Sequence, residues 1–167
     1  ENANILEKNI GAQKFSTENI SVARTAVANR SGTVDFTQGL GTMTHMLRPG
    51  EQHPTVEVPC NRLENLMADH GIEIADFIKI DIEGAEPLLE DSLRQLAGRV
   101  KHFQIEFSNF APRDRYLSLA HALIGEGYVC RHEDDEERLS LDGLAAVLAD
   151  CLDKKKSMAE NIWFSEP

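Results

Sequence analysis

Apolar residues along the chain form short strand-like runs separated by longer helix-like stretches. The segment 77–82, Phe-Ile-Lys-Ile-Asp-Ile, is nearly continuous in apolar residues, as expected for a strand covered on both faces. Four leucines at helical spacing then predict a helix over 87–96. A strand over 100–107 and an amphipathic helix over 112–125 follow. Strands alternating with helices of this length indicate an α/β domain with a largely parallel sheet.

Shorter elements are predicted on either side of this central part. We expect strands over 20–27, 33–36, 55–58, 128–131 and 161–165, and helices over 4–9 and 142–152. A further helix is expected after Asn61, with Asn61 as its N-cap, Glu64 in the capping-box position and Gly71 after its end. Residues 38–54 have no period and predict a long surface loop. By length, residues 1–167 form a single domain.

Composition and charge exclude some classes of function. The chain has 28 acidic and 17 basic residues, a net charge of −11, so phosphate backbones would repel it and nucleic acid is not an expected partner. No stretch approaches the roughly 18 apolar residues of a membrane span, and no signal peptide is visible. Three cysteines, Cys60, Cys130 and Cys151, form no CxxC pair and suggest neither a zinc site nor a disulfide framework. We expect a cytoplasmic protein without a membrane partner.

Carboxylates follow two of the predicted central strands. Asp81 and Glu83 come at the end of the first strand and Glu106 near the end of the next. Ligands bind beyond the carboxyl ends of parallel strands, so Asp81 and Glu106 converge on one crevice if the two strands are neighbours. Gly84 would allow a sharp turn there, and Glu86 would interact favourably with the dipole of the following helix.

An isolated Asp at a strand end is about as often a helix cap as a functional group. The whole acidic string is harder to explain in that way. Four carboxyl groups are costly to hold around a strand end without a cation, a hydroxyl substrate or a metal ion to interact with. This favours a functional site.

The string Lys79-Ile-Asp-Ile-Glu-Gly-Ala-Glu86 resembles the FkbM family of methyltransferases. Leu63-Glu-Asn-Leu66, Gln104-Ile-Glu106, the segment Arg24–Phe36 and Asn161-Ile-Trp-Phe164 are similar to that family as well. The resemblance implies a class I methyltransferase fold, a Rossmann-like, mostly parallel sheet flanked by helices. It also implies S-adenosylmethionine as methyl donor and a hydroxyl of a sugar, polyketide or other small metabolite as acceptor.

The same resemblance implies roles for individual residues. Ala26 and Val27 would lie near the adenine of the cofactor, and Asp81 beside the methyl-transfer crevice. Glu83 and Glu86 would shape the pocket, and Glu106 would face it from the adjacent strand. A carboxylate there could orient or deprotonate the acceptor hydroxyl and favour the cationic sulfonium donor. A divalent metal on Asp81, Glu83 and Glu106 is also open, although no residue requires it.

One family feature is missing from the sequence. No GxGxG-like string is present, because Gly39-Leu-Gly41 follows no long apolar strand and opens no helix. The resemblance places Glu1 beyond the second strand of the fold, so we expect the C-terminal portion of the fold. Strand 77–82 would then be an exposed edge, which another segment or chain is expected to complete.

Two alternatives to an enzyme of this kind stay open. The chain could be a non-catalytic methyltransferase-like module that binds or assembles. It could also be a nucleotide- or metal-dependent enzyme on a similar sheet, which the lack of a phosphate-binding loop disfavours. Within the loop, His45 and His53 are weaker candidates for a general base. Trp163 is expected in the core.

Overall fold

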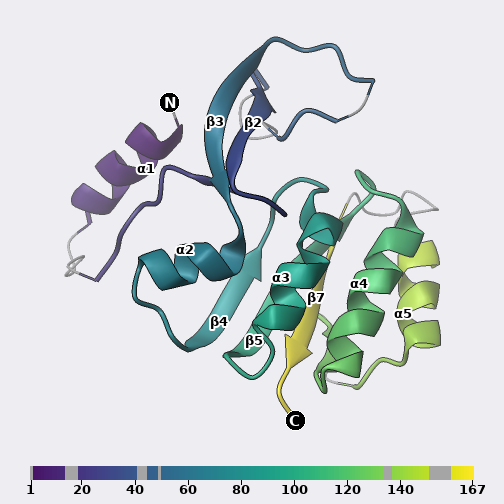
Figure 1. Cartoon of the computed structure of the whole chain (residues 1–167). Coiled ribbons are helices and arrows are strands. Elements are labelled where there is room, and N and C mark those ends of the chain that lie inside the picture. The colour runs from purple at the N-terminus through teal and green to yellow at the C-terminus, as the bar shows by residue number, and fades with distance from the viewer. Residues whose placement is uncertain (1, 14–18, 41–44, 49, 134–136, 151–158) are drawn as a thin grey trace.

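The computed structural model describes residues 2–13, 19–40, 45–48, 50–133, 137–150 and 159–167. It contains two β-sheets, with helices packed along the larger one (Figure 1). In chain order the elements are α1 (Asn2–Gly11), β1 (Ala26–Val27), β2 (Gly32–Thr37), β3 (Thr55–Asn61), α2 (Leu63–Asp69), β4 (Ala75–Ile80), the 3₁₀ helix η2 (Glu86–Leu89), α3 (Glu90–Gln95), β5 (Val100–Ser108), α4 (Arg113–Gly125), β6 (Val129–His132), α5 (Leu141–Leu148) and β7 (Ala159–Ser165).

The larger sheet has the strand order β4-β5-β7-β6. Strands β4 and β5 are parallel, and β7 is antiparallel to both of its neighbours. Helices α3, α4 and α5 lie together along one face of this sheet (Figure 1). That face carries the main core, because alternate residues of β5 such as Phe103, Ile105 and Phe107 are fully buried.

The sequence of α4 explains why this helix packs where it does. Tyr116, Leu119, Ala120 and Leu123 recur at helical spacing and are all 0% exposed. Each large apolar side chain buried in this way contributes roughly 1.5–3 kcal/mol before the entropy of ordering is subtracted. Helix α4 therefore holds the helix-covered face of the sheet in place, and with it the carboxyl ends of β4 and β5.

The opposite face and the β4 edge of this sheet are more open. Phe77 is 46% exposed and stacks on Trp163 with ring centroids 5.5 Å apart, and Ile74 is 66% exposed. Within the described residues, β4 pairs with β5 alone. An additional segment or chain at this edge stays a prediction.

The smaller sheet has the order β1-β3-β2, with β1 parallel and β2 antiparallel to β3. Its buried cluster is small and consists of Ala28, Val34 and Cys60. Cys60 and Cys130 are both buried, free cysteines. Strands β2 and β3 form a ribbon that extends away from the larger sheet (Figure 1).

Several expectations about the fold need correction. The α/β composition is as expected, but the described residues form two mixed sheets and not one mostly parallel sheet. The alternation of side chains that identified the strands is the same for either direction, so it could not reveal that β7 runs antiparallel. The strand expected over 20–27 is reduced to Ala26–Val27, since Cys60 and Asn61 are the residues that pair with it.

Helix boundaries also differ from those expected. Asn61 ends β3 and is not an N-cap: Arg62 takes that position, and the Asn61 Oδ1 accepts the Arg62 N–H at 2.9 Å. Glu64 pairs with the Arg62 side chain and does not complete a capping box. The helix expected over 87–96 is divided into η2 and α3, and Ser140 caps α5. The end of the helix expected over 142–152 lies outside the described residues, as does Cys151. In the described part of the chain, no helix is long and apolar enough to cross a membrane.

Candidate active site

The turn after β4 has an unusual backbone. Glu83 has φ 56° and is the one non-glycine residue with positive φ in the described part of the chain; Gly84 follows with φ 90°. A left-handed conformation costs a residue with a Cβ about 1–2 kcal/mol. Position 84 requires glycine for two reasons. Its φ is positive, and a Cβ there would lie 2.6 Å from the Phe110 Cβ. The turn is therefore strained and closely covered.

Glu86 supports this turn from inside the protein. Its side chain is 0% exposed, and its Oε1 accepts hydrogen bonds from the N–H groups of Ile82 at 2.8 Å and Gly84 at 3.3 Å. The Tyr116 hydroxyl donates to Oε2 at 3.0 Å and lies 3.1 Å from the Ser108 Oγ. Burial raises the pKa of Glu86, and burial together with the Glu86 charge raises the pKa of Tyr116. Glu86 is thus a buried brace of the turn, a position that the helix-dipole argument did not anticipate.

The three predicted catalytic carboxylates lie near one another. Ile80 and Ile105 are opposite one another in the parallel register and both face the core, so Asp81 and Glu106 project to the other face. Burial raises the pKa of Glu106 to about 7, and the charges of Asp81, Glu86 and Glu83 contribute. Asp81 is paired with the Lys79 Nζ at 3.0 Å, and this hydrogen bond raises the pKa of Lys79. The expectation that β4 and β5 are neighbours is confirmed; the shared crevice and the catalytic roles stay predictions.

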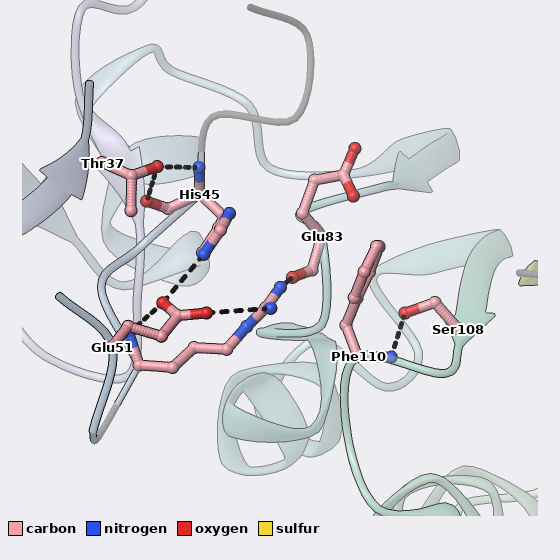
Figure 2. A network of polar contacts seen from close by, with 7 residues as sticks. Thr37, His45, Glu51, Glu83, Ser108 and Phe110 are labelled. Carbon is pink, nitrogen blue, oxygen red and sulfur yellow. Dashed lines mark hydrogen bonds and ion pairs between the residues drawn. The ribbon is translucent and has the colours of Figure 1, made fainter. Parts of the chain in front are cut away.

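Residues 45–48, 50 and 51 belong to the loop between β2 and β3, and this part of the loop reaches the turn from the smaller sheet (Figure 2). Glu51 pairs with the His45 Nε2 at 3.0 Å and accepts the Arg48 N–H at 3.0 Å, a bond that is the largest cause lowering the pKa of Glu51. The Arg48 guanidinium donates to the carbonyl oxygen of Glu83 and lies 4.7 Å from the centre of the Phe110 ring. Sequence reasoning missed Arg48, because a lone arginine in an aperiodic loop gives no signal of its partner 35 positions later.

Figure 2 shows which parts of Glu83 are engaged. Its carbonyl oxygen is in the network, whereas its carboxylate is directed away from Phe110 and from Glu51. The Glu83 carboxylate thus takes no part in the network that holds the turn, although its charge contributes to the raised pKa of Glu106. His45, one of the two weaker base candidates, is 9% exposed and bonded within the loop, while His53 is exposed.

The other predicted residues are also placed. Ala26 and Val27 form β1, where both are partly buried and Val27 packs against the main core. Trp163 is partly buried and lies on the open face with Phe77, not in the core. Among the described residues, no group of three or more His, Cys, Asp or Glu side chains could hold a metal ion, so Asp81, Glu83 and Glu106 form no such group.

Two hollows of the described part of the chain lie elsewhere. One, of about 380 Å³, is lined by residues of α4, β6 and 138–141, and the other, of about 250 Å³, lies between α3 and α4. Neither is lined by the three carboxylates. The acidic groups therefore stand on the open side of the sheet, where Glu106 has Asn161 of β7 opposite it.

Comparison with known families identifies the family to which this site belongs. A family model described as the methyltransferase FkbM domain matches residues 1–137. The chain belongs to the FkbM methyltransferase family. The matched range includes β4, the strained turn, β5 and the loop 45–51, whereas α5 and β7 lie outside it. Neither the curated proteins nor the solved structures that were searched contain a match.

Proposed function

We propose that this FkbM domain transfers a methyl group from S-adenosylmethionine to a hydroxyl of a sugar, a polyketide or another small metabolite. The observation that carries the proposal is the position of Glu106, half-buried with a pKa of about 7, beside Asp81 and Glu83 at neighbouring strand ends. A general base is most effective when its pKa is near the working pH. Family membership supports methyl transfer as the reaction.

The residues present are compatible with part of such a donor. The acidic set suits the positively charged sulfonium end, and Ala26 and Val27 offer small apolar side chains for the adenine. When bound, the donor supplies an electrophilic methyl group. In the proposed arrangement Asp81 orients the acceptor hydroxyl, Glu106 takes its proton and Glu83 borders the acceptor.

The proposal also covers the surroundings of the site. A cytoplasmic setting and a small-molecule or glycan acceptor fit an open acidic surface. A further segment or chain beside β4 would cover the exposed edge and Phe77. A non-catalytic binding or assembly module remains the competing function, motivated by the missing glycine-rich string.

Calorimetry with S-adenosylmethionine and S-adenosylhomocysteine on the folded, full-length protein separates the two functions. We expect saturable binding of both. No heat of binding from an intact sample would sink the enzyme proposal and favour the non-catalytic module.

The Asp81→Asn substitution tests the acceptor side. We expect it to lower kcat by about 10²–10⁴-fold, in the range of a lost acid–base or orienting group. Its effect on the free energy of unfolding should stay below about 1 kcal/mol, since the Lys79 pair is exposed. Asp76→Asn is the matched control, because Asp76 lies on the same strand in an exposed pair with Lys101 at 2.6 Å. Equal kcat in the two variants would remove Asp81 from the reaction.

A further inference from the structure

Arg48 contacts the strained turn from outside, where no sequence motif assigned a function. Its Nη2 donates to the carbonyl oxygen of Glu83, the residue with the left-handed backbone. The same guanidinium lies over the Phe110 ring, and Phe110 covers Gly84. One side chain thus meets both the strained peptide and the residue that packs on it.

The loop holds Arg48 firmly in this position. Glu51 accepts the Arg48 N–H at 3.0 Å and the Nη1 at 3.4 Å. The loop is itself fixed on β2, because the Leu47 N–H donates to the Asp35 carbonyl oxygen at 2.8 Å and the Thr37 N–H to the His45 carbonyl oxygen at 2.9 Å. Arg48 is therefore preorganised and needs little ordering when it binds the Glu83 carbonyl.

The contacts of Arg48 and those of Glu86 together hold the turn from both sides. On the inner side Glu86 accepts the N–H groups of the turn and binds Tyr116, which meets Ser108. The Ser108 Oγ accepts the Phe110 N–H at 3.4 Å, and Phe110 carries the Arg48 guanidinium. The N–H groups of the turn are thus held by Glu86, and its outward carbonyl by Arg48.

We propose that Arg48 is a positioning residue for the transfer reaction. By holding the Glu83 carbonyl it fixes the left-handed conformation of Glu83, and that conformation sets the direction in which the Glu83 carboxylate projects. The inference rests on the proposed function. A planar guanidinium can donate to a carbonyl oxygen with its edge while its face lies over a phenyl ring, and a lysine ammonium has no such plane, so lysine is not an equivalent replacement.

The first test measures the turn without any substrate. Hydrogen–deuterium exchange of peptides that contain residues 82–85 and 110 should become faster in Arg48→Ala than in the natural full-length protein. The Arg30→Ala variant is the control, because Arg30 is exposed and its side chain bonds the Thr33 carbonyl of its own turn. Unchanged exchange in Arg48→Ala would overturn the inference.

The second test measures the reaction, with labelled S-adenosylmethionine and a panel of methyl glycosides and hydroxylated lactones as acceptors. We expect kcat to fall about 10- to 100-fold in Arg48→Ala and Arg48→Lys, with a much smaller change in KM for the donor. Millimolar guanidinium should restore part of the kcat of Arg48→Ala, and ammonium should not. A kcat equal to that of the natural protein, or a loss shared by Arg30→Ala, contradicts the positioning role.

The outcomes separate this inference from the proposed function. If the natural protein transfers no methyl group to any acceptor, the proposed function fails, and the exchange result alone decides whether Arg48 holds the turn. If Arg48→Ala does not fold, Glu51→Gln serves instead, since it loosens Arg48 without altering any residue of the turn. Unchanged exchange and kcat in Glu51→Gln would then refute the inference.

Discussion

The two sheets of this protein differ in how they are stabilised. The larger sheet packs with several helices around a continuous buried core, whereas the smaller sheet buries a cluster of three residues, Ala28, Val34 and Cys60. The acidic turn belongs to the larger sheet and the loop with Arg48 to the smaller one. The acidic turn is therefore mounted on the sheet with the larger buried core, and the loop of the smaller sheet contacts this turn through Arg48 at the Glu83 carbonyl oxygen.

The difference in buried apolar surface between the two sheets predicts a difference in how readily they open. Regions with little buried apolar surface open at lower free energy than core strands do. The smaller sheet and its loop can thus open while β4 and β5 stay folded. Release of Arg48 would then relax the turn without unfolding the sheet beneath it.

The largest expected effect comes from truncating one residue in the core beside each sheet. Leu119→Ala should lower the free energy of global unfolding by about 2–5 kcal/mol, because Leu119 is 0% exposed in the main core. Val34→Ala removes less apolar surface and should lower the stability of the smaller sheet by about 1–2 kcal/mol. This loss should be seen mainly as faster exchange of the β2 and β3 amides. Urea denaturation and amide exchange measure both. If Val34→Ala also loosened β4 and β5, the two sheets would be one cooperative unit.

A smaller effect is expected at Gly84. Gly84→Ala places a Cβ 2.6 Å from the Phe110 Cβ and puts a residue with a side chain into a left-handed backbone conformation. We therefore expect the free energy of unfolding to fall by about 3 kcal/mol. Gly98→Ala is the matched control, because Gly98 also has positive φ, 74°, but has open space around it. The difference between the two free energies of unfolding isolates the contact with Phe110. Equal losses would show that the contact relaxes without cost.

The sequence predicted the larger sheet better than the site. Strand β4 was found because a buried strand is a continuous apolar run, and the meeting of Asp81 and Glu106 follows from where neighbouring parallel strands end. The direction of β7 was not predictable, since side-chain alternation carries no direction. The inward position of Glu86 was missed as well, because a carboxylate at a helix start is usually exposed. Its burial depends on hydrogen bonds from the turn and from Tyr116, 30 positions later, which the local sequence does not reveal.

The smallest expected effect is a pH dependence at Glu106. Its pKa in the folded protein is about 7, raised mainly by burial, against 4.5 for an ordinary glutamate. Between these values the folded state keeps a proton that the unfolded state has lost, so this residue makes stability fall as pH rises from about 4.5 to 7. Glutamine cannot ionise, and Glu106→Gln should therefore gain stability relative to the natural protein across this window. The gain at pH 8 should be about 1 kcal/mol, since solvent at this half-buried position screens part of the full effect.

Thermal unfolding at a series of pH values measures this gain, with Glu73→Gln as an exposed control that should leave the pH profile unchanged. The same Glu106→Gln variant should lose methyl transfer, because an amide cannot accept the proton of the acceptor hydroxyl. A variant that is more stable above neutral pH and inactive would mark Glu106 as a carboxylate kept at a cost in stability. Parallel pH profiles for Glu106→Gln and the natural protein would instead mean that neither burial nor the neighbouring carboxylates raise the pKa of Glu106, and the larger sheet would then carry no such cost in stability at its acidic end.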